Sequence, residues 1–369
     1  MKWFFVVVVV LHGLIHLLGF AKAFGLAEVA QLQQPISRPL GALWLLAAVL
    51  FVVTVILLFA APSWWWVSAA AAVLLSQGLI VSSWKDARFG TIANVIVLVP
   101  LVIAILGRGP SSFRASYQRE VARGLARTAE PAPITEAEIA RLPAPLQRYL
   151  RTAGVLGKEH VRSFHVRFRG QLKSKPDADW MSFTADQTTF LDEPTRLFFI
   201  ESSMFGIPFD ALHAYVGPSA TMKVRLASLL TMVDAKGPEM NRSETVTMLN
   251  DLCLLAPGAL VLPAIRWEER GPLEAKAIYT NAGNTVSAVL SFNEAGELVS
   301  FFSDDRYLSA DGKVFTKYRW TTPVLDHRDF GGVRIAARAE AIWDMPDGPF
   351  TYGRFEVVDI EYNVSATKR

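Results

Sequence analysis

The first 107 residues of this chain hold four long apolar stretches, at residues 3–21, 40–61, 64–84 and 92–107. Each except the last approaches the roughly 20 residues that a helix needs to cross a hydrocarbon layer about 30 Å thick. Four such helices joined by short connections leave no polar face for water, which a soluble bundle requires. The sequence therefore predicts a membrane anchor of four transmembrane helices over residues 1–107.

Residues 21–23 (Ala-Lys-Ala) resemble a signal-peptidase site, so a cleaved leader is the alternative interpretation of the first stretch. Both interpretations place the head on the same side of the membrane. Four spans with an inside amino terminus and three spans with an outside amino terminus both end on the inside. If the amino terminus lies in the cytoplasm, these basic residues lie there too: Lys2, Arg108, Arg114, Arg119, Arg123 and Arg127. This orientation leaves Lys22, Arg38, Lys85 and Arg88 outside. Because basic residues favour the inside, we expect a cytoplasmic head.

A basic helical segment and a proline-containing linker follow the anchor and together span residues 108–133. The net charge of the whole chain is +3, and the surplus of basic residues precedes residue 130, so the remainder is mildly acidic. A nucleic-acid surface needs basic groups gathered on the domain itself, and we expect no nucleic-acid partner. The arginines suit either anionic lipid headgroups or the positive-inside rule.

The only cysteine, Cys253, excludes an intrachain disulfide and a thiolate metal cluster. It lies in the apolar run 252–255, where a buried, inert thiol is expected rather than a nucleophile.

Residues 134–369 have the pattern of a soluble, strand-rich domain. Thr135 and Glu138 have the spacing of a capping box that opens a helix. Apolar side chains then recur at every second position at 164–169, 286–292 and 333–343, between polar or charged ones for the most part, which predicts strands with one wet face and hence an antiparallel sheet. Gly- and Asn-containing turns separate the strands, and a helix is expected at 243–256. The simplest fold is an α+β head in which helices pack on the inner face of a curved antiparallel sheet.

Several short motifs in the head recur in a known family. They are MLND at 248–251, LAPGAL at 255–260, RWE at 266–268, SDDRY at 303–307, WTTP at 320–323, EAIW at 340–343, YGRF at 352–355 and EYN at 361–363. In these motifs the chain resembles an uncharacterised bacterial family. HGLIH at 12–16 is similar to members with a membrane anchor. The resemblance implies a multi-pass protein of the bacterial inner (cytoplasmic) membrane and brings no activity with it.

The order of helix, long strands, inserted helix and further hairpins is also loosely similar to the half-barrels of lipoprotein carriers, which hold acyl chains. That similarity implies a half-barrel-like sheet and a lipid-like ligand. It concerns the fold alone, and fold does not determine function.

His12 and His16 lie four residues apart on the first span, hence on one face of that helix. Two imidazoles so placed ligate haem or a metal ion if other helices complete the shell, and otherwise they form hydrogen bonds between helices. The other spans offer only weak ligands: Thr54, Ser76 and Gln77. We expect interhelical hydrogen bonds and no cofactor, with haem or a metal at His12 and His16 as the alternative.

Asn250 and Asp251 lie in the otherwise apolar helix of the head, where an uncompensated carboxylate is costly to bury. They either bind groups of neighbouring strands or face a cavity. Met and aromatic side chains, abundant in the head, adapt to irregular apolar ligands. The sequence-based candidates for ligand contact are therefore Asn250, Asp251, Trp267, Phe198 and Met248.

No metalloprotease His spacing, phosphate-binding Gly-rich loop or Gly-x-Ser-x-Gly elbow occurs, so no catalytic motif is present. The leading hypothesis is a membrane-anchored binding protein whose head takes a lipid-like or other apolar ligand. A membrane enzyme that uses Asp251, Asp304 or Asp305 on a lipidic substrate remains open. So does an interaction module that docks another membrane protein. A large cavity would favour the binding protein, and converging carboxylates with raised pKa would favour the enzyme. An exposed apolar patch would favour the interaction module.

Overall fold

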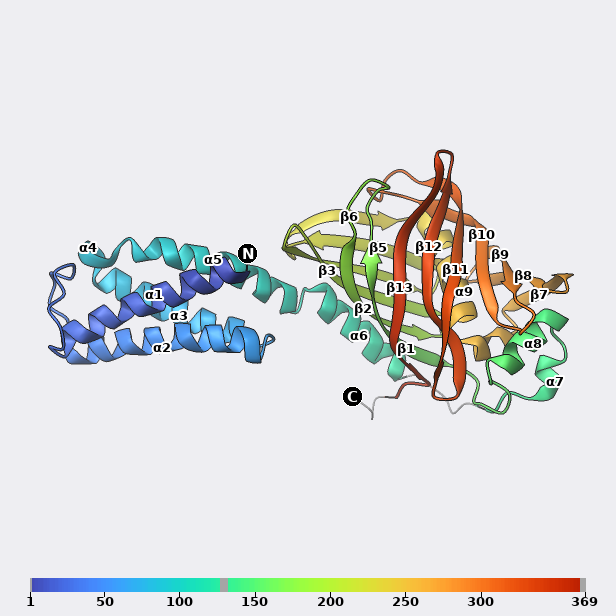
Figure 1. The fold of residues 1–369 in the computed structure, drawn as a ribbon, viewed down its shortest axis with the longest axis horizontal. Coiled ribbons are helices and arrows are strands. Elements are labelled where there is room, and N and C mark those ends of the chain that lie inside the picture. Colours follow the sequence, from blue (N-terminus) through green and yellow to red (C-terminus); the bar gives the residue numbers. More distant parts are fainter. Residues whose placement is uncertain (1, 127–131, 366–369) are drawn as a thin grey trace. The chain divides into compact units, whose positions relative to one another are not determined.

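The computed structural model describes residues 2–126 and 132–365 and divides into two compact units, Met1–Gly109 and Pro110–Arg369. The first unit consists of helices (Figure 1). They are α1 (Lys2–Ala23), α2 (Arg38–Ala60), α3 (Trp65–Ser82), the short α4 (Trp84–Ala87) and α5 (Gly90–Arg108). Within the described residues, four helices are long and apolar enough to cross a membrane. This confirms the four long apolar helices predicted for this part of the chain.

Two glycines of α1 allow close packing against α2. A Cβ at Gly13 would lie 2.9 Å from the Cβ of Phe51, and one at Gly19 would lie 2.3 Å from the Trp44 ring. Small residues at helix crossings let backbones approach closely, which is the usual basis of helix association in a membrane.

Across the described part of the second unit, thirteen strands form one antiparallel sheet in the order β6-β5-β4-β3-β2-β1-β13-β12-β11-β10-β9-β8-β7. The strands of the first half are β1 (Ser163–Leu172), β2 (Met181–Phe190), β3 (Thr195–Met204), β4 (Ile207–Val216), β5 (Ser219–Leu226) and β6 (Leu230–Lys236). Those of the second are β7 (Ile265–Gly271), β8 (Glu274–Asn281), β9 (Asn284–Phe292), β10 (Leu298–Leu308), β11 (Thr316–Phe330), β12 (Val333–Met345) and β13 (Gly348–Tyr362). Two meanders thus join where β1 pairs with β13.

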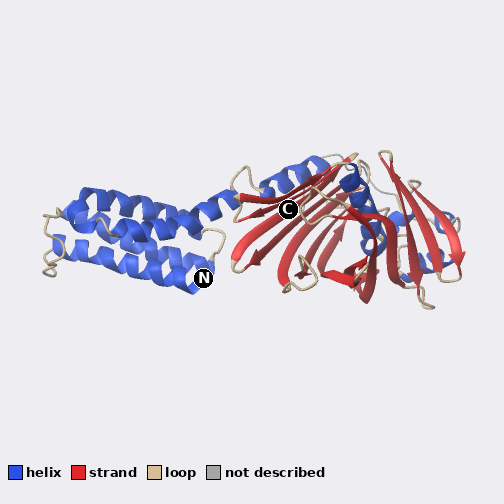
Figure 2. Ribbon diagram, turned by 90° about the horizontal axis from the view of Figure 1, so that it is seen from above, coloured by secondary structure: helices blue, strands red, loops and turns tan. Residues whose placement is uncertain are grey.

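The sheet curls around the helix between the two meanders, as Figure 2 shows, and forms the half-barrel that the sequence predicted. The predicted alternation on β1 is confirmed. Phe164, Val166 and Phe168 are buried in the core, whereas Arg167 and Arg169 are exposed on the outer face.

On β3 and β4 the outer face of the sheet is not exposed to water, contrary to the prediction of one wet face. Their outer face is covered by α6 (Phe113–Leu125), the basic segment that follows the anchor. Phe113 and Tyr117 of α6 pack there with Phe199 and Leu212 in a second apolar cluster. This explains why β3 carries the unbroken apolar run 197–200. Residues 130 and 131 of the predicted linker lie outside the described residues.

Helix α9 (Pro238–Leu255) and the 3-10 turn η1 (Pro257–Val261) connect the meanders. The helix begins five residues earlier than its predicted start at Ser243, because Pro238 occupies the first turn, a position that suits proline. Asn241 and Ser243 instead bind the sheet: Asn241 accepts from the Ala220 N–H at 2.7 Å, and Ser243 from that of Tyr307 at 3.0 Å. Every residue from Ser243 to Leu255 is buried, so each polar side chain of α9 needs an internal partner.

Two short helices precede β1, and the second of them contacts the carboxyl end of α9. They are α7 (Glu136–Ile139), opened by the predicted Thr135–Glu138 capping box, and α8 (Ala144–Thr152). The Tyr149 hydroxyl on α8 donates to the Cys253 carbonyl at 2.7 Å, and that of Tyr362 on β13 donates to the Leu255 carbonyl at 2.5 Å. The last turn of α9 is thereby fixed, and Cys253 is fully buried, as predicted.

Candidate functional site: a cavity between α9 and the sheet

A cavity of about 640 Å³ lies between α9 and the concave face of the sheet. Its size falls within the range of small-molecule sites, which run from roughly 300 to 1,000 Å³. Most of its wall is apolar. The larger apolar side chains of the wall include Phe168, Phe198, Ile200, Met204, Phe209, Met222, Val224, Leu226, Met232, Met240, Phe315, Phe350 and Phe355. Some of the lining, such as Lys175, Pro176 and Met232, is exposed, so the cavity opens to the outside.

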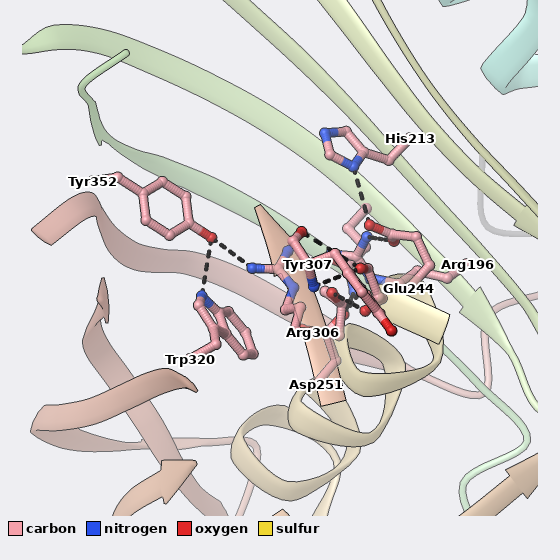
Figure 3. A network of polar contacts seen from close by, with 11 residues as sticks. Arg196, His213, Glu244, Asp251, Arg306, Tyr307, Trp320 and Tyr352 are labelled. Carbon is pink, nitrogen blue, oxygen red and sulfur yellow. Dashed lines mark hydrogen bonds and ion pairs between the residues drawn. The ribbon is translucent and has the colours of Figure 1, made fainter. Parts of the chain in front are cut away.

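A buried polar cluster forms part of the cavity lining, and Arg196 of β3 is its centre (Figure 3). The Arg196 Nε donates to Asp251 Oδ2 at 2.5 Å, and its Nη1 donates to Glu244 Oε2 at 3.0 Å. The Arg196 Nη2 donates to Gln187 Oε1 at 3.1 Å, and Gln187 in turn donates to Asp251 at 2.8 Å. The two carboxylates are seven residues apart on α9, hence on the same face of that helix.

His213 of β4 completes this cluster, because its Nδ1 donates to Glu244 Oε1 at 3.3 Å. Burial disfavours the charged form of Glu244, but Arg196 and His213 outweigh burial and lower its pKa to about 2. Burial also disfavours the charged form of Asp251, and there it prevails over Arg196 and raises the pKa. One guanidinium therefore holds two carboxylates whose proton affinities differ.

A second cation, Arg306 of β10, lines the cavity on the side of the second meander. Its guanidinium carbon lies 4.0 Å from the ring centroid of Trp320 and 5.1 Å from that of Trp343. The Arg306 Nη1 donates to the Tyr352 hydroxyl at 3.0 Å, which also accepts from Trp320 Nε1 at 3.2 Å. The Nε of Arg306 is buried and has no hydrogen-bond partner among the residues that the structure describes. The Tyr352 hydroxyl and the two indoles thus hold the guanidinium of Arg306 in place at the cavity wall.

Three of the five sequence-based ligand candidates line the cavity: Phe198, Asn250 and Asp251. Asn250 donates to Thr322 of β11 at 2.6 Å, so it ties α9 to the second meander while Asp251 ties it to the first.

The other two candidates do not line the cavity. Met248 is fully buried in the core, where its sulfur accepts from Tyr279 at 3.6 Å, and Trp267 on β7 donates to the Leu260 carbonyl at 3.1 Å. Met248 does not reach the cavity because α9 is buried on all sides, and only part of its surface borders the cavity while the rest packs in ordinary core.

The aspartates at 304 and 305 lie outside the cavity lining. Asp304 accepts two hydrogen bonds from Arg319, at 2.8 and 3.0 Å. Asp305 pairs with Arg242 at 2.7 Å and accepts from the Ser287 N–H at 2.9 Å. Both belong to β10 itself rather than to a turn, because the strand continues to Leu308.

Sequence reasoning missed Arg196, His213 and Glu244. It considered Arg306 only as a partner of Asp304 and Asp305, which instead pair with Arg319 and Arg242. A signal for Arg196 existed: it is in phase with Phe198 and Ile200, so its charge had to face the interior of the sheet. A buried arginine needs acidic partners, and Glu244 and Asp251 were available at a one-face spacing on the buried helix.

In the anchor, His12 and His16 form the expected hydrogen bonds between helices. His12 Nε2 lies 2.9 Å from Asn94 Oδ1 of α5, and His16 Nε2 lies 3.0 Å from Ser76 Oγ of α3. Asn94 is the partner that sequence reasoning overlooked. In the part of the chain that the structure describes, no third His, Cys, Asp or Glu joins this pair to form a metal-binding group. Haem or a metal ion at this pair stays an untested prediction.

Comparison with known proteins places the head in a family. Residues 132–355 match the family described as a family of unknown function (DUF6544). This range contains most of the motifs quoted above, and the match confirms the resemblance predicted from them. No curated protein matches the chain.

Two solved structures are similar to part of this chain. One is a putative outer membrane lipoprotein-sorting protein domain from Vibrio parahaemolyticus, at 10% identity and a TM-score of 0.33, covering 55% of this chain and 86% of that one. The other is a LolA superfamily protein from Nitrosomonas europaea, at 12% identity and a TM-score of 0.34, covering 60% of this chain and 96% of that one.

Proposed function

We propose that this chain, which belongs to the DUF6544 family of unknown function, is a membrane-anchored binding protein whose head takes a lipid-like ligand. The observation that carries the proposal is the cavity of about 640 Å³ with apolar walls between α9 and the sheet. Natural cores are close-packed, with few voids larger than a water molecule, so an apolar space of this size that opens to the outside supports a binding site.

The chemistry of the wall favours a hydrocarbon chain. Six methionines, at 181, 204, 222, 232, 240 and 345, line the cavity together with phenylalanines. Such side chains adapt to flexible apolar ligands, because the thioether is unbranched and polarisable. Each methylene of a ligand buried there is worth about 0.8 kcal/mol, before the costs of association.

Arg306 supplies the polar contact for such a ligand. Its guanidinium is held by Tyr352 and the two indoles, and the side chain lines the cavity. A carboxylate or phosphate oxygen that reaches this guanidinium from the cavity would gain a charge-assisted interaction. We therefore infer an amphipathic ligand with an acidic group near Arg306.

The engagement of the carboxylates supports binding over catalysis. Glu244 and Asp251 both bind Arg196, and Asp304 and Asp305 pair with arginines outside the cavity. A general acid or base must reach the proton it transfers, and these groups are already committed to the fold.

For the location, we infer that the four apolar helices cross the bacterial inner membrane with the head on the cytoplasmic side. The distribution of basic residues around the spans supports this orientation, because it favours the cytoplasmic side for Lys2 and Arg108. A docking module for another membrane protein remains the competing account of the exposed apolar surface.

The experiment fills the cavity and measures ligand uptake. Ala339 of β12 lines the cavity, whereas Val358 on the neighbouring β13 is 48% exposed. Ala339→Trp is expected to abolish binding of a dansyl-labelled fatty acid to the full-length protein, because the indole occupies the space of the chain. Val358→Trp adds an indole without entering the cavity and should bind like the wild type. Equal binding by both folded variants, or none by the wild type, would refute the proposal.

A further inference from the structure

Two neighbouring hairpins of the first meander carry an unusual amount of exposed apolar surface. Phe205, in the turn between β3 and β4, is 90% exposed, and Ile207 beside it is 37% exposed. In the next hairpin, between β5 and β6, Leu229 is 55% and Leu230 61% exposed, followed by Met232 at 54%. We call these five side chains the apolar tips. Clustered exposed apolar residues of this kind mark an interaction site rather than ordinary surface.

The backbone of the first hairpin strengthens this interpretation. Phe205 has φ = +52° and Gly206 has φ = +76°. Such a two-residue turn strongly favours Asn or Asp at its first position, since few side chains tolerate the left-handed region. A bulky aromatic residue that occupies this position and contacts almost nothing in the head gains nothing for the fold of the head.

The apolar tips lie where the chain enters this unit. Arg225, at the end of β5, donates to the Ser111 carbonyl at 3.3 Å and stacks over Phe113, with 4.2 Å to the ring centroid. Arg114 likewise pairs with Glu201, near the end of β3. The first turn of α6 is therefore fixed beside the two hairpins.

The length of the chain limits how far these hairpins are from the bilayer. Helix α5 ends at Arg108, and Ser111 follows three residues later. Three residues span at most about 11 Å when fully extended. If α5 crosses the membrane, as the proposed function requires, the point at which Ser111 meets Arg225 lies within that distance of the end of the span.

The cavity reaches the same hairpins. Met204 and Phe209 flank the β3–β4 turn, Leu226 and Met232 flank the β5–β6 turn, and all four line the cavity. A lipid that left the bilayer at the tips would thus meet a continuous apolar path into the cavity.

We propose that the apolar tips insert into the membrane leaflet at which α5 ends, so that the cavity exchanges its ligand directly with the bilayer. This inference rests on the proposed function for its ligand and its anchor. The five tip side chains are uncharged, and two of the nearby basic residues are paired, Arg114 with Glu201 and Lys223 with Asp234, so insertion depends mainly on apolar burial. Insertion is consequently expected in uncharged phosphatidylcholine as well as in anionic membranes.

The test measures the depth of single side chains in the full-length protein, reconstituted into phosphatidylcholine nanodiscs. Nitroxide labels are placed by Phe205→Cys and Leu230→Cys. Val216→Cys is the matched control, since Val216 is 43% exposed at the opposite end of β4. The native Cys253 is fully buried, so we expect the nitroxide reagent to react only with the introduced cysteine.

Labels at 205 and 230 are expected to collide more often with oxygen, which concentrates in lipid, than with a water-soluble nickel complex. The label at 216 should show the reverse. Equal nickel accessibility at all three positions would overturn the inference. The depth measurement needs no bound ligand, so an empty cavity would contradict the proposed function and leave this inference standing. A chain that alkaline carbonate releases from vesicles would contradict the anchor itself.

Discussion

Arg196 on β3 and Asp251 on α9 form a buried ion pair, with 2.5 Å between Nε and Oδ2, that ties the central helix to the first meander. On the other side, Asn250 ties the same helix to β11 through Thr322. Adjacent residues of α9 thus bind opposite halves of the half-barrel. The helix is held at both sides while the space beside it remains unfilled, which is how the fold maintains a cavity without collapse.

Removal of Arg196 should be strongly destabilising. Arg196→Met leaves Glu244 and Asp251 buried without their partner, and a broken buried ion pair typically costs about 3–5 kcal/mol. For a domain of this size, we expect Tm to fall by roughly 6–20 °C. Thermal unfolding of the full-length protein in detergent, followed by circular dichroism, measures this. Arg167→Met removes an exposed arginine of β1 and serves as control. A Tm equal to that of the control variant would show that the cluster does not hold α9.

Asp251→Asn should separate binding from catalysis. The substitution keeps the shape of the side chain but removes its charge, so a moderate loss of stability, about 1–3 kcal/mol, is expected. A binding protein should still take up the labelled fatty acid, because the cavity wall is unchanged. Complete loss of function in a folded Asp251→Asn variant would instead indicate that the carboxylate acts chemically.

The stability of the fold should depend on pH through the carboxylate of Glu244. Its pKa of about 2 in the folded state is below the ordinary value of 4.5, because Arg196 and His213 outweigh burial. A group with a lowered pKa stabilises the fold above its ordinary value and loses that stabilisation as the pH falls through the folded one. Asp251, whose pKa is raised, acts in the opposite direction.

Glu244→Gln isolates the contribution of Glu244. We expect the Tm of the wild type to exceed that of the variant at neutral pH, and the difference to narrow between about pH 4.5 and about pH 2. Thermal unfolding of both proteins across this range is the measurement. A constant difference would mean that Glu244 does not titrate there.

Arg306 should set the preference for acidic ligands. Arg306→Met keeps an apolar side chain between the two indoles but removes the charged donors, and a hydrogen bond to a charged group is worth about 1.5–3 kcal/mol. Affinity for a fatty acid should fall by roughly 10- to 100-fold. Affinity for the corresponding fatty alcohol should change much less, as competition with the dansyl probe would reveal. An equal loss for both ligands would place Arg306 in a purely structural role.

Local patterns sufficed to predict much of the architecture. The apolar lengths predicted the four helices, and the alternation at Phe164, Val166 and Phe168 predicted an inner and an outer face of the sheet. These features depend on residues close in sequence, where period and hydrophobicity act directly. The pairing of β1 with β13 was not predictable in this way, because it joins segments almost two hundred residues apart.

The candidate site was predictable only in part, for two physical reasons. A helix buried on all sides has no polar face, so the pattern could not distinguish Asn250, at the cavity, from Met248, in the core. A cavity is also an absence of packing, which composition does not encode: the same methionines and phenylalanines fill a solid core equally well. Arg196 was the one available clue, as a charge in phase with inward-facing apolar residues.

Native mass spectrometry of the full-length protein, with extraction and identification of bound lipids, tests most directly whether the head holds a lipid-like ligand. We predict a co-purifying acidic acyl compound in the wild type and in Val358→Trp. The same compound should be absent from a folded Ala339→Trp variant. A ligand-free wild type that also fails to bind added acyl compounds would contradict the account. So would a bound lipid that Ala339→Trp retains, since the lipid would then lie outside the cavity.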